Sequence, residues 1–508
     1  MARPHRWMTA LAGLALLVVV PLPQSNAADP PQTGFEQNGG TAWTTFEEEI
    51  AFLTAVDAAT ERVELEVIGR TEDGRPLHLV RMGSPRPVSA AVARTRPVEL
   101  HICTQHGNEA AGRDACLSSL RDLAFTTDAT LVKQLAETTI LFVPTVNPDG
   151  RQNNARANTS GVDINRDHLN LQSPESRAIA RVIRDYEPEI SVDHHEYGPA
   201  VPVAYDDEVL YLWPRNLNVD KEIRDLGIEF SKESLNPCLA ERGYSSDEYG
   251  LYAAGPVDVT QTAGDGDEGI ARNLAGLRHT VGILIESGVT QNLLNGPGEV
   301  MTAENQKRRV ASQMATIDCT LTFVRENSAR LVAAQQGSVA RKIAEGRDRS
   351  APVYFQGQDE DTTITGDAPP TVEAEAPCAY DLTAAQAREV AVLLDLQGIQ
   401  TTPRPGGGVR VPMAQAAEPV IPLLFDARNE DRVATEGTPV EVCAAAGPAR
   451  PAPVQPAPPQ AQPAPSAPSP RPRGELPSTG GIVTTMLAGL GLAAAAGALH
   501  RRRTSFAG

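Results

Sequence analysis

Basic residues are scarce in this chain of 508 residues, which has 45 Lys and Arg against 64 Asp and Glu and a formal net charge of −19. Proteins that bind nucleic acids or anionic membrane surfaces use clusters of Lys and Arg to displace counterions. The charge balance therefore argues against both as partners. With 41% hydrophobic and 21% charged residues, most of the chain has the composition of a folded protein, and its length predicts two or three domains.

The chain also lacks a Cys-x-x-Cys pair, which argues against a metal cluster built on cysteines. Its six cysteines are an even set that permits three disulfides in fifteen connectivities, and the sequence selects none of them. We expect Cys103 to be a buried strand thiol or one half of a structural bridge. No internal repeat is evident at any fixed period.

Long apolar runs are confined to the two ends of the chain. The first, residues 11–20, follows basic residues and precedes the small residues Ser25-Asn26-Ala27. About ten apolar residues are too few to span a bilayer. We therefore expect residues 1–27 to be a cleaved secretory signal peptide.

The second apolar run belongs to a segment with three ordered parts, residues 476–508. Leu476-Pro477-Ser478-Thr479-Gly480 is followed by the apolar residues 481–499 and then by three arginines, 501–503. An apolar segment followed by positive charge is a stop-transfer arrangement. The whole resembles the sorting signal of sortase substrates. That resemblance implies sortase as a partner, a transient membrane segment, cleavage after Thr479 and attachment to peptidoglycan of a Gram-positive cell wall; a plain transmembrane tail is the alternative.

The folded part is expected to have two units and a spacer. Residues 42–330 alternate short apolar runs with amphipathic stretches, which is typical of an α/β domain whose sheet is covered on both faces. Long helical periodicity over 303–347 predicts a last helix that continues into a linker helix and loop at 331–377. Within the domain we expect strands at 98–104, 139–144, 190–193 and 280–285, and helices at 110–123 and 173–185.

A smaller α/β or α+β module is expected at 378–445, and nothing in it looks catalytic. Its pattern predicts a helix at 383–397, a Pro-Gly turn at 405–408 and strands at 409–412 and 420–424. A packing role is favoured over a wall-binding role. The Pro- and Ala-rich residues 446–475 then predict an extended, semi-rigid spacer.

Two polar segments follow predicted strands of the larger domain. Gln105-His106-Gly107-Asn108-Glu109 comes at the end of a strand, so His106 and Glu109 can converge on one cation. Two ligands do not make a hydrolytic zinc site, which takes about three protein ligands and leaves a position for water. His194-His195-Glu196-Tyr197 follows the predicted strand 190–193 and offers the third ligand.

The order of these and three further motifs resembles the carboxypeptidase A family of zinc peptidases over roughly residues 44–325. Five motifs in order are far more specific than any one of them. The resemblance implies a mixed, largely parallel central sheet flanked by helices, one Zn²⁺ per chain and hydrolysis of C-terminal peptide bonds in a peptide or protein substrate. The further motifs are Asn147-Pro148-Asp149-Gly150, Arg156 with Gly161 to Arg166, and Leu284-Ile285-Glu286-Ser287.

The resemblance assigns the metal ligands as His106, Glu109 and a histidine of the segment 193–195. The family's pattern there reads Asp, any residue, His, which selects His195. Alternate strand residues point to opposite faces of a sheet, so only one histidine of the pair should face the metal. We expect His194 to be a hydrogen-bonded packing residue.

The same resemblance assigns five further roles. Glu286 matches the glutamate that takes a proton from the attacking water and returns it to the leaving amine. Arg156 matches the arginine that stabilises the oxyanion. Asn165 and Arg166 match the pair that holds the substrate's terminal carboxylate. Asp163 is expected to accept the free ring N–H of His106.

One departure from the family leaves the specificity open. The mobile tyrosine that contacts substrate has no match, and residues 264–278 occupy its position. Asp265 and Asp267 of this segment could favour a basic substrate side chain or only decorate a solvated loop.

The sequence therefore predicts a secreted, wall-anchored zinc metallocarboxypeptidase. A zinc amidohydrolase acting on peptidoglycan stem peptides or other non-standard amides is the alternative. An inactive wall-displayed binding protein is the third reading, and the complete set with Glu286 and Arg156 argues against it.

Overall fold

The computed structural model describes residues 29–198, 207–249, 266–289, 302–357, 372–373, 375–432 and 435–442. The predicted signal peptide, the spacer, the sorting signal and Asp265 lie outside the described residues. Among the described helices, none combines the length and the apolar composition needed to cross a membrane.

The larger domain is built on one eight-stranded sheet with the strand order β1-β2-β4-β3-β5-β8-β6-β7. The pairs β4·β3, β3·β5, β5·β8 and β6·β7 are parallel and the other three are antiparallel. The predicted mixed, largely parallel sheet is therefore confirmed. Its strands are β1 (Val63–Arg70), β2 (Pro76–Met82), β3 (Val98–Cys103), β4 (Thr139–Val143), β5 (Ile190–Tyr197), β6 (Val209–Leu212), β7 (Ser246–Glu248) and β8 (Val281–Gly288).

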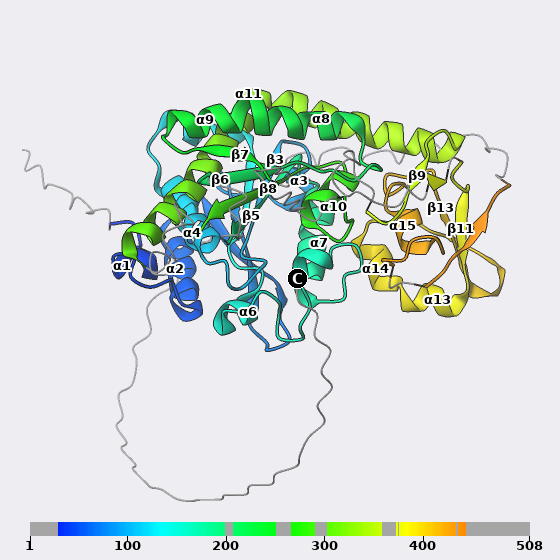
Figure 1. The fold of residues 1–508 in the computed structure, drawn as a ribbon, viewed down its shortest axis with the longest axis horizontal. Helices are drawn as coiled ribbons and strands as arrows, with labels where there is room; N and C mark the ends of the chain where they lie inside the picture. The colour runs from blue at the N-terminus through cyan, green and yellow to red at the C-terminus, as the bar shows by residue number, and fades with distance from the viewer. Residues whose placement is uncertain are drawn as a thin grey trace, which may run out of the picture. The chain divides into compact units, whose positions relative to one another are not determined.

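Helices cover both faces of this sheet, so its central strands are buried on both sides (Figure 1). On β3, Leu100 and Ile102 pack towards α7, whereas Cys103 packs towards α2, α4 and α11. The helices of the domain are α1 (Gly34–Gln37), α2 (Phe46–Ala59), α3 (Ala90–Ala93), α4 (Ala111–Phe125), α5 (Ala129–Glu137), α6 (Pro148–Asn153), η1 (Ile164–Arg166), α7 (Pro174–Tyr186), α8 (Lys221–Glu229), η2 (Phe230–Leu235), α9 (Asn236–Glu241), α10 (Ala271–Leu277) and α11 (Ala303–Asp348).

The two strands nearest the predicted chemistry are longer than expected. β5 continues to Tyr197, so His194 and His195 lie inside the strand rather than after it. The extension follows from pairing, because β8 also continues to Gly288 and places Glu286 opposite His195.

Residues 375–442, called the small module below, form an α+β unit at the carboxyl end of α11 (Figure 1). Its four-stranded sheet has the order β12-β13-β11-β14. The described elements after α11 are β9 (Val353–Tyr354), β10 (Val372–Glu373), β11 (Ala379–Leu382), α13 (Ala384–Glu389), α14 (Ala391–Leu396), β12 (Thr402–Pro403), η3 (Pro405–Gly407), β13 (Val409–Pro412), α15 (Ile421–Phe425) and β14 (Thr438–Val440).

The strand predicted at 420–424 is wrong, because this segment forms helix α15. Pro422 lies in the first turn of the helix, where its missing N–H costs no hydrogen bond, whereas in a central strand it would break the ladder. The predicted helix at 383–397 is interrupted at Val390, where the backbone leaves the helical region between α13 and α14.

Two disulfides join elements of the larger domain. Cys103 of β3 is bonded to Cys116 of α4, and Cys238 of α9 is bonded to Cys319 of α11. Cys378 is also disulfide-bonded. The structural bridge considered for Cys103 is thus the one observed.

Candidate functional site

Three predicted ligands meet at the carboxyl end of the sheet. His106 and Glu109 lie in the loop from β3 to α4, and His195 lies in β5. The two Nδ1 atoms of His106 and His195 are 3.0 Å apart, and each lies 2.8 Å from a carboxylate oxygen of Glu109. All three residues are buried, and their ligand atoms lie within 4.8 Å of one another.

The outward nitrogen of each histidine faces a carboxylate. His106 Nε2 lies 3.2 Å from Asp163 Oδ1, and His195 Nε2 lies 2.7 Å from Asp193 Oδ2. A proton on each Nε2 therefore gives both hydrogen bonds and leaves each Nδ1 lone pair directed inwards. Two imidazole nitrogens and one carboxylate are a donor set that suits zinc, so these residues fit the expected metal.

Asp193 is held in turn by a buried amide. Gln105 Nε2 donates to Asp193 Oδ2 at 2.7 Å, and Gln105 Oε1 lies 2.6 Å from His168 Nε2. Asn165 Nδ2 donates to the same Asp193 oxygen at 3.3 Å. The sequence motifs predicted no role for Asp193, Gln105 or His168. The position of Asp193 and Gln105 could have indicated such a role, because each is a polar residue inside or beside an otherwise buried strand.

A buried ion pair between Arg309 and Glu196 supports the loop that carries Glu109. The Arg309 guanidinium on α11 donates to both oxygens of Glu196 at 2.6 and 2.9 Å. Glu196 Oε2 also accepts from the Ala111 backbone N–H at the start of α4, and the Glu196 N–H donates to Glu109. The start of α4 has no side-chain cap of its own, so Glu196 takes that role.

Glu286 lies on β8 directly opposite His195. Its carboxylate is buried, and Oε2 has no hydrogen-bond partner within the described residues. Burial, followed by the negative charge of Glu109, raises the pKa of Glu286 to about 8, while His195 and Arg156 oppose the shift. An orphaned buried carboxylate beside a ligand set is the feature expected of a group that exchanges protons there.

Arg156 brings positive charge to the same site. Its Nε donates to Asp163 Oδ2 at 2.9 Å, and its Nη1 lies 3.1 Å from His106 Nδ1 and 3.7 Å from Glu109. The side chain remains 47% exposed, so substrate can reach the guanidinium.

The predicted carboxylate-binding pair has two different environments. Asn165 is buried, and its Oδ1 accepts from the Ala271 N–H at 2.8 Å, so its amide is engaged within the protein. Arg166 is 41% exposed, and its Nε lies 3.4 Å from Asp267 Oδ2. Asp267 also accepts from the Gly269 N–H at 2.7 Å, so its side chain is anchored within its own segment as well as paired with Arg166.

His194 points away from the ligand trio, towards α11. Gln313 Nε2 donates to the His195 carbonyl at 2.6 Å, so Gln313 Oε1 accepts from His194 Nδ1 at 2.7 Å. His194 Nε2 then accepts from His101 Nδ1 at 3.0 Å, and His101 Nε2 lies 2.9 Å from Glu99. Burial, followed by the neighbouring His101, lowers the pKa of His194 to about 3.

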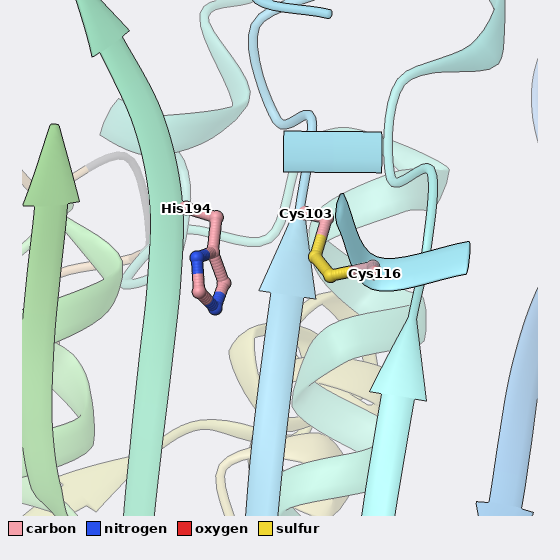
Figure 2. A group of neighbouring side chains, drawn as sticks. All are labelled: Cys103, Cys116 and His194. Carbon is pink, nitrogen blue, oxygen red and sulfur yellow. A yellow bond between two sulfur atoms is a disulfide. The ribbon is translucent and has the colours of Figure 1, made fainter. Parts of the chain in front are cut away.

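A second cluster of possible metal donors surrounds His194 (Figure 2). Cys103 and Cys116 lie beside its ring, and the ligand atoms of the three residues lie within 4.8 Å of one another. The two sulfurs are joined as a disulfide, so neither is a thiolate that could bind a metal. We regard this cluster as structural.

The fold is a mixed α/β sheet, and the donor set at its edge suits zinc. Comparisons with known proteins show which families this chain resembles. Residues 50–255 match the family model described as zinc carboxypeptidase. The predicted resemblance to this family is supported over that range.

Curated relatives also match part of the chain. Carboxypeptidase 2 of Trichophyton tonsurans is 28% identical over 229 residues, which are 43% of this chain and 42% of the relative. Probable carboxypeptidase 2 of Trichophyton verrucosum (strain HKI 0517) is 31% identical over 228 residues, 43% of each chain. Carboxypeptidase E of Caenorhabditis elegans is 31% identical over 128 residues, 22% of this chain and 26% of the relative. The chain thus spans less than half the length of the curated relatives it matches.

A metallo-carboxypeptidase from Burkholderia cenocepacia is among the similar solved structures. It aligns with a TM-score of 0.43 and 21% sequence identity, over 56% of this chain and 70% of that chain.

Proposed function

We propose that this chain is a zinc metallocarboxypeptidase that hydrolyses the C-terminal peptide bond of a peptide or protein. The convergence of His106, Glu109 and His195, with Glu286 on the adjacent strand, carries the proposal. The family match over residues 50–255 and the curated carboxypeptidases support it.

The three ligands would hold one Zn²⁺ per chain. A zinc ion held there supplies Lewis-acid chemistry, which polarises a scissile carbonyl and activates water near neutral pH. Asp163 and Asp193 keep the ligand histidines in the required tautomer and orientation.

Glu286 is the proposed general base and acid. Oε2 has no partner within the described residues and is available to accept a proton from the attacking water and give it to the leaving amine. A buried carboxylate with a free oxygen beside the ligand set can perform both transfers, because the same oxygen can accept a proton from one group and donate it to another.

The two arginines are proposed to bind charge at different stages. Arg156, whose guanidinium adjoins His106 and Glu109, would stabilise the oxyanion as it develops on the scissile carbonyl. Arg166, half-exposed, would bind the terminal carboxylate. Asn165 would hold the segment of Arg166 in place through its hydrogen bond with the Ala271 N–H.

We further propose that the protein is secreted and attached to the cell wall. The N-terminal residues 1–27 and the ordered parts of residues 476–508 support this proposal from the sequence. Mass spectrometry of wall fragments should find a peptide ending at Thr479 linked to peptidoglycan. Recovery of the intact tail in the membrane fraction would contradict it.

The decisive experiment measures amino acid release from a mixed peptide library, with and without chelator. We expect release by the purified chain, none with chelator, and a loss of about a thousandfold in kcat for Glu286→Gln with zinc still bound. Glu189→Gln is the matched control, because Glu189 is also a buried glutamate at β5 but lies at the strand's opposite end. Unchanged activity of Glu286→Gln would refute the proposal. Zinc binding without amino acid release from any peptide would favour an amidohydrolase that acts on peptidoglycan stem peptides. The same protein would then be tested on those stem peptides.

A further inference from the structure

We propose that the small module is part of the substrate site, because Gln397 and Asn429 hold in place the two segments that carry Arg166 and Asp267. This inference rests on the proposed role of Arg166 as the group that binds the terminal carboxylate. Gln397 and Asn429 are positioning residues, since neither contacts the ligand trio or Arg166 directly.

Gln397, at the end of α14, reaches the segment that follows Arg166. It is fully buried, and its Nε2 donates to the backbone carbonyls of His168 and Leu169 at 2.9 and 3.0 Å. Its Oε1 accepts from Arg278 Nη1 at 3.2 Å, just after α10. One buried amide of the module thus bonds to the segment that follows Arg166 and to Arg278 at the end of α10.

Asn429 reaches the other segment, residues 266–273. Its Nδ2 donates to Glu268 Oε1 and to the Leu423 carbonyl, each at 2.7 Å. Glu268 and Asn429 are both fully buried, and Glu268 is the neighbour of Asp267 in the chain. The side chain that orients Glu268 therefore comes from the small module.

The two segments are themselves joined with little free space. The Gly269 carbonyl accepts from the His168 N–H at 3.0 Å, and a Cβ added at Gly269 would lie 2.4 Å from the Arg166 carbonyl oxygen. Ala271 N–H donates to Asn165. A shift of either segment therefore moves the Arg166 and Asp267 side chains together.

A plain packing role would not require these amides. The interface between module and domain already contains a large apolar cluster that includes Leu274, Leu277, Tyr380 and Phe425. Buried amides add directional hydrogen bonds that fix one arrangement, and each costs free energy if left without a partner. Gln415 provides the contrast, because it is also buried and, within the described residues, its side chain bonds to Gln400 and Pro412 inside the module.

The test compares Gln397→Met and Asn429→Leu with Gln415→Met, because each change removes an amide while roughly keeping side-chain volume. Substrates are N-acetylated dipeptides with a free terminal carboxylate. We expect KM to rise about tenfold in the first two variants, with kcat within about twofold and zinc content unchanged. Gln415→Met should lower Tm and leave KM at the wild-type value.

A binding measurement keeps the test independent of catalysis. Titration calorimetry of zinc-free protein with the same dipeptides should show about tenfold weaker binding in Gln397→Met and Asn429→Leu. Dipeptides that end in an amide lack the terminal carboxylate, so the wild-type protein and both variants should bind them equally. If the wild-type protein binds the dipeptides with a free carboxylate more tightly than the variants do but cleaves none of them, the proposed function is refuted and this inference stands. Active wild-type protein with unchanged KM and affinity in both variants would overturn it, and if one variant fails to fold the other decides.

Discussion

At the scale of single residues, the proposed metal ligands depend on side chains that are not themselves proposed ligands. Asp193 accepts from His195 Nε2 and is itself held by Gln105. A carboxylate in this position fixes the ring and raises the basicity of its inward nitrogen. The support for His195 is therefore an ordered chain of buried hydrogen bonds and not one contact.

We predict that Asp193→Asn lowers zinc affinity about tenfold to a hundredfold without changing the fold. The amide keeps the size of the side chain but removes the negative charge that polarises His195. Competition with a chromophoric chelator would measure the affinity. Asp185→Asn on the surface of α7 is the control, and equal affinities in the two variants would contradict the role given to Asp193.

Glu99 predicts a pH dependence of stability. Burial raises its pKa to about 8 in the folded protein, from 4.5, so the folded state keeps a proton that the unfolded chain loses between these pH values. The free energy of unfolding should therefore fall as pH rises from about 5 to 8. Glu99→Gln keeps a donor towards His101 and should remove the share of this fall that Glu99 contributes, on the order of 3 kcal/mol. Urea unfolding at several pH values tests it, with the exposed Glu64→Gln as control; parallel pH profiles would contradict it.

At the scale of elements, two glycines of α11 respond in opposite directions to one substitution. A Cβ at Gly346 would lie 2.2 Å from the Met413 backbone oxygen, so Gly346→Ala should destabilise the protein by about 1–3 kcal/mol. At Gly337 the nearest atom is the mobile end of Arg341 at 3.0 Å, so Gly337→Ala should stabilise the helix by about 0.5–1 kcal/mol. Denaturant unfolding measures both. Stabilisation by both variants would show that α11 does not press on the module at Met413.

The sequence predicted the fully buried central strands better than the strand β1 at the edge of the sheet. The central strands β3, β4, β5 and β8 were expected within a few residues. β1 was not predicted, because its apolar residues alternate with Glu64 and Glu66 and form no continuous apolar run. The run at 420–424 was misassigned, since five apolar residues do not distinguish a strand from a buried helix and Pro422 was the deciding residue.

The residues of the site also fall into two groups. Some belong to motifs that the sequence shows, and the others come together only when the chain folds. His106, Glu109, His195 and Glu286 were predicted from ordered motifs and lie together, as their strand ends require. The contacts of Gln105 with Asp193 depend on the register between β3 and β5. Gln397 reaches His168 across more than two hundred residues of sequence, and no local pattern predicts that contact.

At the scale of the whole molecule, the small module and the catalytic sheet share one hydrophobic cluster. Val192 of β5 and Ile283 of β8 belong to the same buried set as Tyr380 and Phe425 of the module. Two parts that bury a common apolar surface lose it together, so the described part of the chain should unfold cooperatively. The module has no predicted metal ligand, which makes zinc a selective probe of this coupling.

We predict one calorimetric unfolding transition for the module and the catalytic domain, shifted upwards as a whole by zinc. A ligand at a hundred times its Kd stabilises the folded state by about 2.7 kcal/mol, which corresponds to several degrees in Tm. His106→Ala should abolish the shift and keep the single transition. Two transitions, of which zinc moves only one, would show that the module folds independently. Gln397 and Asn429 would then join two separately stable units, and the module could detach from the substrate site without unfolding.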